Sequence, residues 1–170
     1  LLYYAMLMFY ANGGNDCYIV SVGDYDPTNK AITAEDINPG IDALNKATEP
    51  TMVVVPDAVS PSCSADQAQG IMQHMLLHCG TKKSRVSIFD VYEGYKTPPS
   101  STDYPEVDAF RNAIGTNFLE YGAVYYPWLN TSTVSLNDIG INNITQASLS
   151  DFFTAVNLDA ATKTKLDTYL

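Results

Sequence analysis

Gly122-Ala-Val-Tyr-Tyr-Pro-Trp-Leu129 is the stretch of this sequence that says most about the fold. Four small, apolar or aromatic residues, Ala123 to Tyr126, predict a buried strand. Pro127 has no amide hydrogen to donate to a central ladder, so the strand should end there. Trp128, the only tryptophan of the chain, follows directly. A large amphipathic ring at this place predicts an anchor that fixes the exit loop onto the core.

Three similar apolar runs precede this strand, namely Cys17–Val22, Thr51–Val55 and Val86–Phe89. Helical patterns separate the runs, at Leu1–Ala11, Pro39–Lys46, Asp66–Cys79 and Glu106–Leu119. Asn12-Gly13-Gly14 should close the first of these helices, because Gly and Asn adopt the left-handed conformation. Apolar strands that alternate with helices are typical of βαβ units. The sequence therefore predicts an α/β fold: a mainly parallel four-strand sheet with helices on both faces.

The organisation changes after Leu129, where the sequence becomes polar and rich in Asn. We expect two parts: an α/β core over residues 1–129, and a C-terminal helical and irregular appendage over residues 130–170. Within the appendage, Val134 and Leu136 alternate like a short edge strand, and Ser148–Val156 and Ala160–Leu170 have helical spacing. Leu1–Ala11 is predicted to be part of a buried helix, and the chain to be an internal piece of a longer protein.

The balance of charge bears on the partners of the chain. Its formal net charge is −10, with 19 acidic against 9 basic residues. Because phosphate neutralisation needs clustered Lys and Arg, this argues against a nucleic-acid partner. The basic cluster Lys82-Lys83-Arg85 is interpreted as a helix-to-strand connection. Leu1–Ala11 is too short to span a bilayer, and we expect no membrane partner.

The three cysteines, Cys17, Cys63 and Cys79, are an odd number without a Cys-x-x-Cys pair. Neither a disulfide scaffold nor a zinc ribbon is indicated, and a reducing compartment is the simpler expectation. Cys17 should pack inside its strand as a small hydrophobic residue.

Three carboxylates could carry chemistry, because Asp24, Asp57 and Asp90 each fall at or just after the end of a predicted strand. In open α/β sheets that edge binds ligands, and converging carboxylates could hold Mg²⁺ for phosphoryl transfer. Asp is also a common turn residue in such loops. We expect no metal site here, and keep a Mg²⁺-dependent α/β enzyme as the alternative function.

Two further patterns suggest chemistry only weakly. His74 and His78 are spaced to share a helix face, but position 75 is Met, so the Glu of a His-Glu-x-x-His zinc motif is missing. Structural histidines are the expectation. Ser60 and Ser62 could be exposed nucleophiles, yet the sequence has no Gly-x-Ser-x-Gly elbow, and a Pro-Ser loop is the simpler interpretation.

Four segments together resemble contractile tail sheath proteins of phages, R-type pyocins and phage-like injection systems. They occur in the same order as in that family: Phe9–Val22 with its Asn-Gly-Gly turn and Cys-Tyr strand, Val53–Ala58, Arg85–Val91 and Tyr121–Leu129 with its Tyr-Tyr-Pro-Trp. The residues that carry the resemblance are taken as structural motif residues: Asn12, Gly13, Gly14, Cys17, Pro56, Asp57, Asp90, Tyr125, Tyr126, Pro127 and Trp128.

This resemblance implies a tail sheath core fold and a structural function without catalytic residues, cofactors or metal. It implies hexameric rings of the protein stacked helically around an inner tube protein, contact with baseplate proteins, and contraction that drives the tube into a target cell. It also implies assembly in the bacterial cytoplasm, as part of a phage tail or a phage tail-like particle. Sheath subunits are longer and exchange terminal extensions as added strands, and those extensions are not recognisable here.

Overall fold

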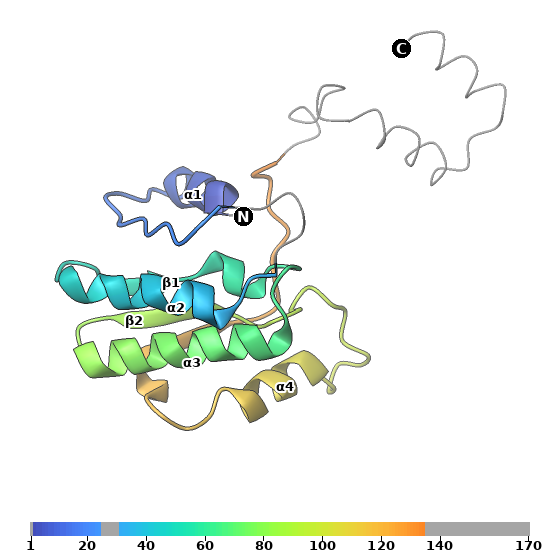
Figure 1. Ribbon diagram of the computed structural model, residues 1–170. Helices are drawn as coiled ribbons and strands as arrows, with labels where there is room; N and C mark the ends of the chain where they lie inside the picture. The colour runs from blue at the N-terminus through green and yellow to red at the C-terminus, as the bar shows by residue number, and fades with distance from the viewer. Residues whose placement is uncertain (1, 25–30, 135–170) are drawn as a thin grey trace, which may run out of the picture. The chain divides into compact units, whose positions relative to one another are not determined.

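The computed structural model describes residues 2–24 and 31–134, which form a mixed α/β structure around a small parallel sheet (Figure 1). The boundary between the two units of the chain lies between Asn130 and Thr131. The strand position predicted at Leu136 and the helices predicted over 148–156 and 160–170 lie outside the described residues.

The sheet has three strands in the order β1 (Met52–Val54), β2 (Val86–Asp90) and β3 (Gly122–Tyr125). All neighbouring pairs are parallel; Val54 aligns with Ile88, and Ile88 with Ala123. The sequence predicts these three strands and their direction, and the structure confirms both. Each strand is a short apolar run that ends where a proline, an aspartate or an aromatic loop begins.

The predicted fourth strand, Cys17–Val22, is not a strand in the described structure. Side chains hold the segment instead: the Tyr18 hydroxyl donates to Glu49 Oε2 at 3.0 Å, and Val22 packs against Gly40. The error has a physical cause. An apolar, β-branched run shows that a segment suits a pleated surface, but a strand exists only where another edge accepts its hydrogen bonds.

Three helices have an end that is marked by a capping or turn signal in the sequence. α1 (Leu2–Ala11) ends at the predicted Asn-Gly-Gly turn, and α3 (Ala65–Lys82) is capped at its N-terminus by Ser64, whose hydroxyl accepts from Gln67 N at 3.4 Å. α2 (Ala34–Ala43) begins earlier than predicted, because Thr33 caps its N-terminus. Pro39, where the helix was predicted to start, lies inside it. The 3-10 turn η1 (Leu44–Lys46) extends α2, and η2 (Pro56–Val59) follows β1.

α4 (Pro105–Ala113) is shorter than the predicted Glu106–Leu119. Its apolar spacing continues past Ala113, but Gly115 has φ +80° and Phe118 has φ +58°. Neither conformation belongs to a right-handed helix, so the chain turns through η3 (Leu119–Tyr121) into β3.

The core lies between one face of the sheet and helices α2 and α3. Val53, Ser87 and Phe89 point into it from the strands and are almost fully buried. The apolar residues of the core are Ile37, Ile41, Val53, Ala58, Cys63, Ala68, Ile71, Met72, Met75, Leu76, Cys79, Phe89 and Ile114. Each large apolar side chain among them contributes roughly 1.5–3 kcal/mol to stability through burial.

The second face of the sheet is exposed in the described part of the chain. Val53 is 3% exposed, whereas its neighbours Met52 and Val54, which point the other way, are 62% and 57% exposed, and Tyr125 on the same open face is 59% exposed. The expectation of helices on both faces is therefore wrong for the described residues. Right-handed crossovers that step in one direction from β1 to β2 to β3 place α3 and α4 on the same side.

α1 also departs from expectation, because none of its residues is buried. Its exposed apolar residues occupy every side of the helix and are Tyr3, Tyr4, Leu7, Met8, Phe9 and Tyr10. A helix that is apolar all round is normally covered in a finished structure. None of the helices in the described ranges is long and apolar enough to cross a membrane.

Candidate functional site

The carboxyl ends of the three strands bring together three of the four segments that the sequence singles out. Pro56 and Asp57 begin η2 directly after β1, Asp90 is the last residue of β2, and Tyr126 follows β3. Parallel strands end at the same edge of a sheet, and in α/β proteins this edge most often carries the functional site. It is therefore our candidate site.

Trp128 anchors the chain at this edge. Its indole Nε1 donates to the Val91 carbonyl at 2.8 Å, and its backbone N donates to the Gly94 carbonyl at 3.1 Å. The ring of Tyr95 lies 5.2 Å from the indole, centroid to centroid. A Cβ atom on Gly94 would come within 2.8 Å of Trp128, so the loop after β2 fits against the ring only with glycine there. The half-buried Trp128 thus ties the exit of β3 to the exit of β2.

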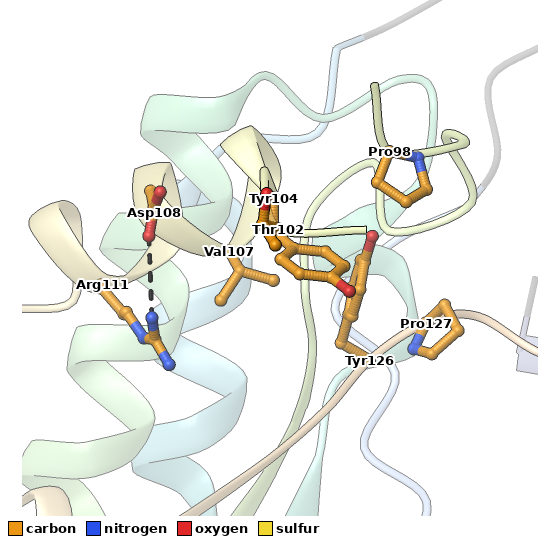
Figure 2. A pocket seen from close by; sticks show the side chains of 8 residues that line it. All are labelled: Pro98, Thr102, Tyr104, Val107, Asp108, Arg111, Tyr126 and Pro127. Carbon is orange, nitrogen blue, oxygen red and sulfur yellow. Dashed lines mark ion pairs between the residues drawn. The ribbon is translucent and has the colours of Figure 1, made fainter. Parts of the chain in front are cut away.

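Beside this anchor lies an open pocket of about 570 Å³ (Figure 2). Tyr104 and Tyr126 form its aromatic part, with ring centroids 6.0 Å apart and nearly perpendicular planes. An Asp108–Arg111 ion pair of 3.6 Å lies at one side. The remaining lining residues are Pro98, Thr102, Val107 and Pro127.

The pocket has the chemistry of a binding surface. Rings and prolines offer apolar contact, while the buried Tyr126 hydroxyl has no hydrogen-bond partner in the described structure. A phenol of this kind can donate to a carbonyl or accept from an amide of a bound group. The lining residues contain no Ser, Cys or His that could act as a nucleophile beside a base.

The three candidate aspartates are not assembled into a metal centre. Among residues 2–24 and 31–134, no group of three or more His, Cys, Asp or Glu side chains is close enough to hold a metal ion. Asp57 is half-buried in η2, and Asp24 is exposed. Desolvation by its surroundings raises the pKa of the Asp90 carboxyl, although the residue as a whole keeps contact with solvent.

The two histidines of α3 face different partners. His74 Nε2 lies 2.9 Å from Asp42 Oδ1, whereas His78 Nε2 lies 3.0 Å from Arg85 Nη1. Arg85 also donates to the carbonyls of Leu44 and Ala47, at 3.1 and 2.6 Å, and so binds the end of η1. The pair His74 and His78 therefore has structural partners, as the sequence suggests.

The burial of Arg85 is a feature that the sequence does not reveal. Arg85 is only 4% exposed, and the end of a helix offers it the negative ends of peptide dipoles in place of a carboxylate. The sequence places Arg85 in a helix-to-strand connection, where an arginine after Lys82 and Lys83 usually faces water. A short charged run contains no signal that one member is buried.

The candidate nucleophiles are not prepared for attack. Ser60 is buried, so it is not the exposed nucleophile that the alternative interpretation requires, whereas Ser62 is exposed. Burial raises the thiol pKa of Cys63 and of Cys79, so both thiols stay protonated at neutral pH.

The amino-terminal motif acts locally. Gly13 has φ +83°, and Asn12 Nδ2 donates to the Met8 carbonyl at 2.8 Å, so the turn closes α1 as predicted. A Cβ on Gly14 would lie 2.3 Å from the Phe9 ring. Cys17 is exposed, with its Sγ 3.6 Å from the Tyr10 hydroxyl, so its predicted packing inside a strand is wrong.

The pocket was also missed by sequence analysis, since Tyr104 and Val107 lie at the start of α4, far along the chain from Tyr126 and Pro127. Only the order of the strands brings β3 beside β2 and its following loop. No protein-family model matches the chain, and no curated protein matches it either.

Proposed function

We propose that this chain is the α/β core of a contractile tail sheath subunit. In this proposal it assembles with copies of itself as hexameric rings stacked around an inner tube, contacts baseplate proteins, and contracts to drive the tube into a target cell. The assembly would form in the bacterial cytoplasm as part of a phage tail or a phage tail-like particle. No catalytic residue, cofactor or metal is assigned. Support comes from the four sequence segments and from two features of the structure.

The observation that carries the proposal is the apolar surface that the described residues leave uncovered. α1 buries none of its side chains, and one face of the sheet exposes Met52, Val54 and Tyr125. Soluble monomers rarely expose continuous apolar surface of this kind, and larger patches mark contact with other chains. A subunit of a permanent assembly needs such surfaces.

The second support is the way the sheet edge is tied together. Val91 N donates to the Tyr125 carbonyl at 3.2 Å, and Trp128 Nε1 donates back to the Val91 carbonyl at 2.8 Å. These reciprocal bonds make the exits of β2 and β3 one unit. Contraction by movement of subunits as rigid bodies requires a core that keeps its shape while contacts between subunits change.

The test is negative-stain electron microscopy of the full-length protein expressed alone, in which we expect long striated tubes. A Val54→Lys variant places a charge on the open sheet face and should abolish the tubes. Leu77→Lys is the matched control, because Leu77 is an apolar residue of similar exposure on α3, away from that face. Tubes with the control and none with Val54→Lys would support the proposal; a wild-type protein that remains monomeric would contradict it.

A further inference from the structure

Aromatic residues from three segments lie around Pro127 at the carboxyl edge of the sheet. Tyr95, in the loop after β2, packs on Trp128 with ring centroids 5.2 Å apart. Tyr104, the residue before α4, packs edge-on against Tyr126 with ring centroids 6.0 Å apart (Figure 2). Pro127 joins the two pairs, because it lies between Tyr126 and Trp128 in the chain.

These aromatic rings keep a large surface outside the hydrophobic core. Tyr95 is 62% exposed and Tyr104 is 37% exposed, and neither belongs to the core cluster. Tyrosines held in place beside water are enriched at binding surfaces, because each offers a large apolar area and a polar tip. The pocket of about 570 Å³ between Tyr104 and Tyr126 is therefore a place where a ligand gains apolar contact.

The charges of the pocket favour an uncharged ligand. Asp108 and Arg111 are the charged residues among those that line it, and their charged groups lie 3.6 Å apart. Their side chains are mostly exposed, so the pair lies at the rim and contributes little. A cation or an anion would meet one attracting and one repelling group, whereas a neutral ligand leaves the pair undisturbed.

The shape of the pocket favours an extended peptide over a small molecule. Sites for small molecules usually enclose most of the ligand, and this pocket is open on one side. A proline-rich segment in the polyproline II conformation lies along an open aromatic surface, and its carbonyls have no internal hydrogen bonds. The Tyr126 hydroxyl, which has no hydrogen-bond partner among the described residues, can donate to such a carbonyl.

We propose that this pocket binds an uncharged, proline-rich peptide segment in the polyproline II conformation, with proline rings packed on Tyr104 and Tyr126. A polyproline II helix is already formed before binding, so little conformational entropy is lost and a small site suffices. The inference goes beyond the sheath proposal, because the pocket shares no residue with α1 or with Met52, Val54 and Tyr125 of the open sheet face.

The experiment titrates the full chain with decaproline that is acetylated at one end and amidated at the other, so that the peptide is neutral. Calorimetry measures the affinity. Trp128 is the only tryptophan of the chain and follows Pro127 directly, so its fluorescence reports binding at this place. A Gly-Ser peptide of equal length with the same blocked ends is the control ligand, because it is flexible and has no proline rings. We expect saturable binding of decaproline and no binding of the control peptide.

Variants of the lining residues locate the contact. Tyr104→Leu removes a ring and Val107→Lys places a charge in the lining, and each should weaken binding at least about tenfold. Ala109→Lys is the matched control for Val107→Lys, because Ala109 is an exposed residue of α4 outside the lining, and it should bind as wild type does. Asp108→Asn and Arg111→Gln should each change the affinity by less than about twofold.

Circular dichroism checks that each variant is folded, and if Val107→Lys does not fold, Tyr104→Leu decides alone. Decaproline that produces neither heat nor a fluorescence change would overturn the inference, and so would equal binding of the Gly-Ser peptide. Undiminished binding by Tyr104→Leu would also overturn it. Loss of binding in Asp108→Asn or in Arg111→Gln would replace the neutral ligand with a cationic or an anionic one. None of these results depends on tubes in electron microscopy, so this inference and the sheath proposal can fail separately.

Discussion

The Nη1 atom of Arg85 lies 3.0 Å from Nε2 of His78, and both side chains are buried, with 4% and 5% of their surface exposed. Arg85 can only donate, so His78 must accept at Nε2 and carry its proton at Nδ1. Burial lowers the pKa of His78, and the charge of Arg85 lowers it further. This contact joins α3 to the start of β2 and depends on a neutral imidazole.

The first prediction is that acid destabilises the fold through His78. Its pKa is lower in the folded chain than the ordinary value of 6.5, so the unfolded chain binds the proton more readily. The contribution to stability is complete above pH 6.5 and is lost as the pH falls below that value. Urea unfolding between about pH 7 and pH 5 measures this slope. His78→Gln keeps an acceptor and should flatten it; an unchanged slope would contradict the assignment.

The second prediction concerns Trp128. Replacing it with Ala removes the ring packed on Gly94 and Tyr95 and the bond to the Val91 carbonyl, and should cost about 2–4 kcal/mol of unfolding free energy. Trp128→Phe keeps a ring but loses the N–H donor, so it should cost about 1–2 kcal/mol. Denaturant midpoints of both variants test this. A Trp128→Ala midpoint equal to that of wild type would show that Trp128 does not stabilise the fold.

The third prediction tests the same anchor from the other side. A Cβ on Gly94 would lie 2.9 Å from the Val91 carbonyl oxygen and 2.8 Å from the Trp128 ring. Backbone cannot yield as a flexible side chain does, so Gly94→Ala should cost roughly 1–3 kcal/mol. Gly23→Ala is the control, because a Cβ there meets nothing within 4 Å. Equal melting temperatures for Gly94→Ala and Gly23→Ala would show that the loop adapts freely.

The fourth prediction is that Tyr126→Phe does not weaken the fold. The Tyr126 hydroxyl is buried and has no hydrogen-bond partner among the described residues, and an unsatisfied buried polar group costs about 1–3 kcal/mol. Removing it should leave the unfolding free energy unchanged or raise it by about 1 kcal/mol. Tyr104→Phe is the comparison, because the Tyr104 hydroxyl donates to the Ser101 carbonyl at 2.9 Å and its loss should be unfavourable. A clear loss of stability in Tyr126→Phe would reveal a hydrogen bond at this hydroxyl.

The fifth prediction concerns Asp90. Desolvation raises its pKa above the ordinary value of 3.8, so the folded chain holds the proton more tightly than the unfolded chain does. Its charged form therefore destabilises the fold, and this penalty grows as the pH rises from 3.8 through the folded pKa. Asp90→Asn should raise the melting temperature at pH 7 and have little effect near pH 3. A lower melting temperature at neutral pH would show that a partner stabilises the carboxylate.

The amino-acid sequence by itself determined the elements whose causes are local. Runs such as Val86–Phe89 and the stretch before Pro127 predicted the strands, and Asn12-Gly13-Gly14 predicted the end of a helix, because propensity and capping act over a few neighbouring residues. The parallel direction followed from the alternation of strands and helices. The indole N–H of Trp128 also donates a hydrogen bond to a carbonyl, as its position directly after the strand predicts.

Tertiary structure alone decided the rest. Whether Cys17–Val22 pairs depends on a free edge elsewhere in the chain, and whether α1 is covered depends on a surface to receive it; neither is encoded in the segment itself. The burial of Arg85 and the joining of Tyr104 to Tyr126 arise from contacts between distant segments. The open sheet face has the same origin, because the handedness of successive crossovers assigns the helices to one side. Such features depend on the order of the strands, which no local pattern contains.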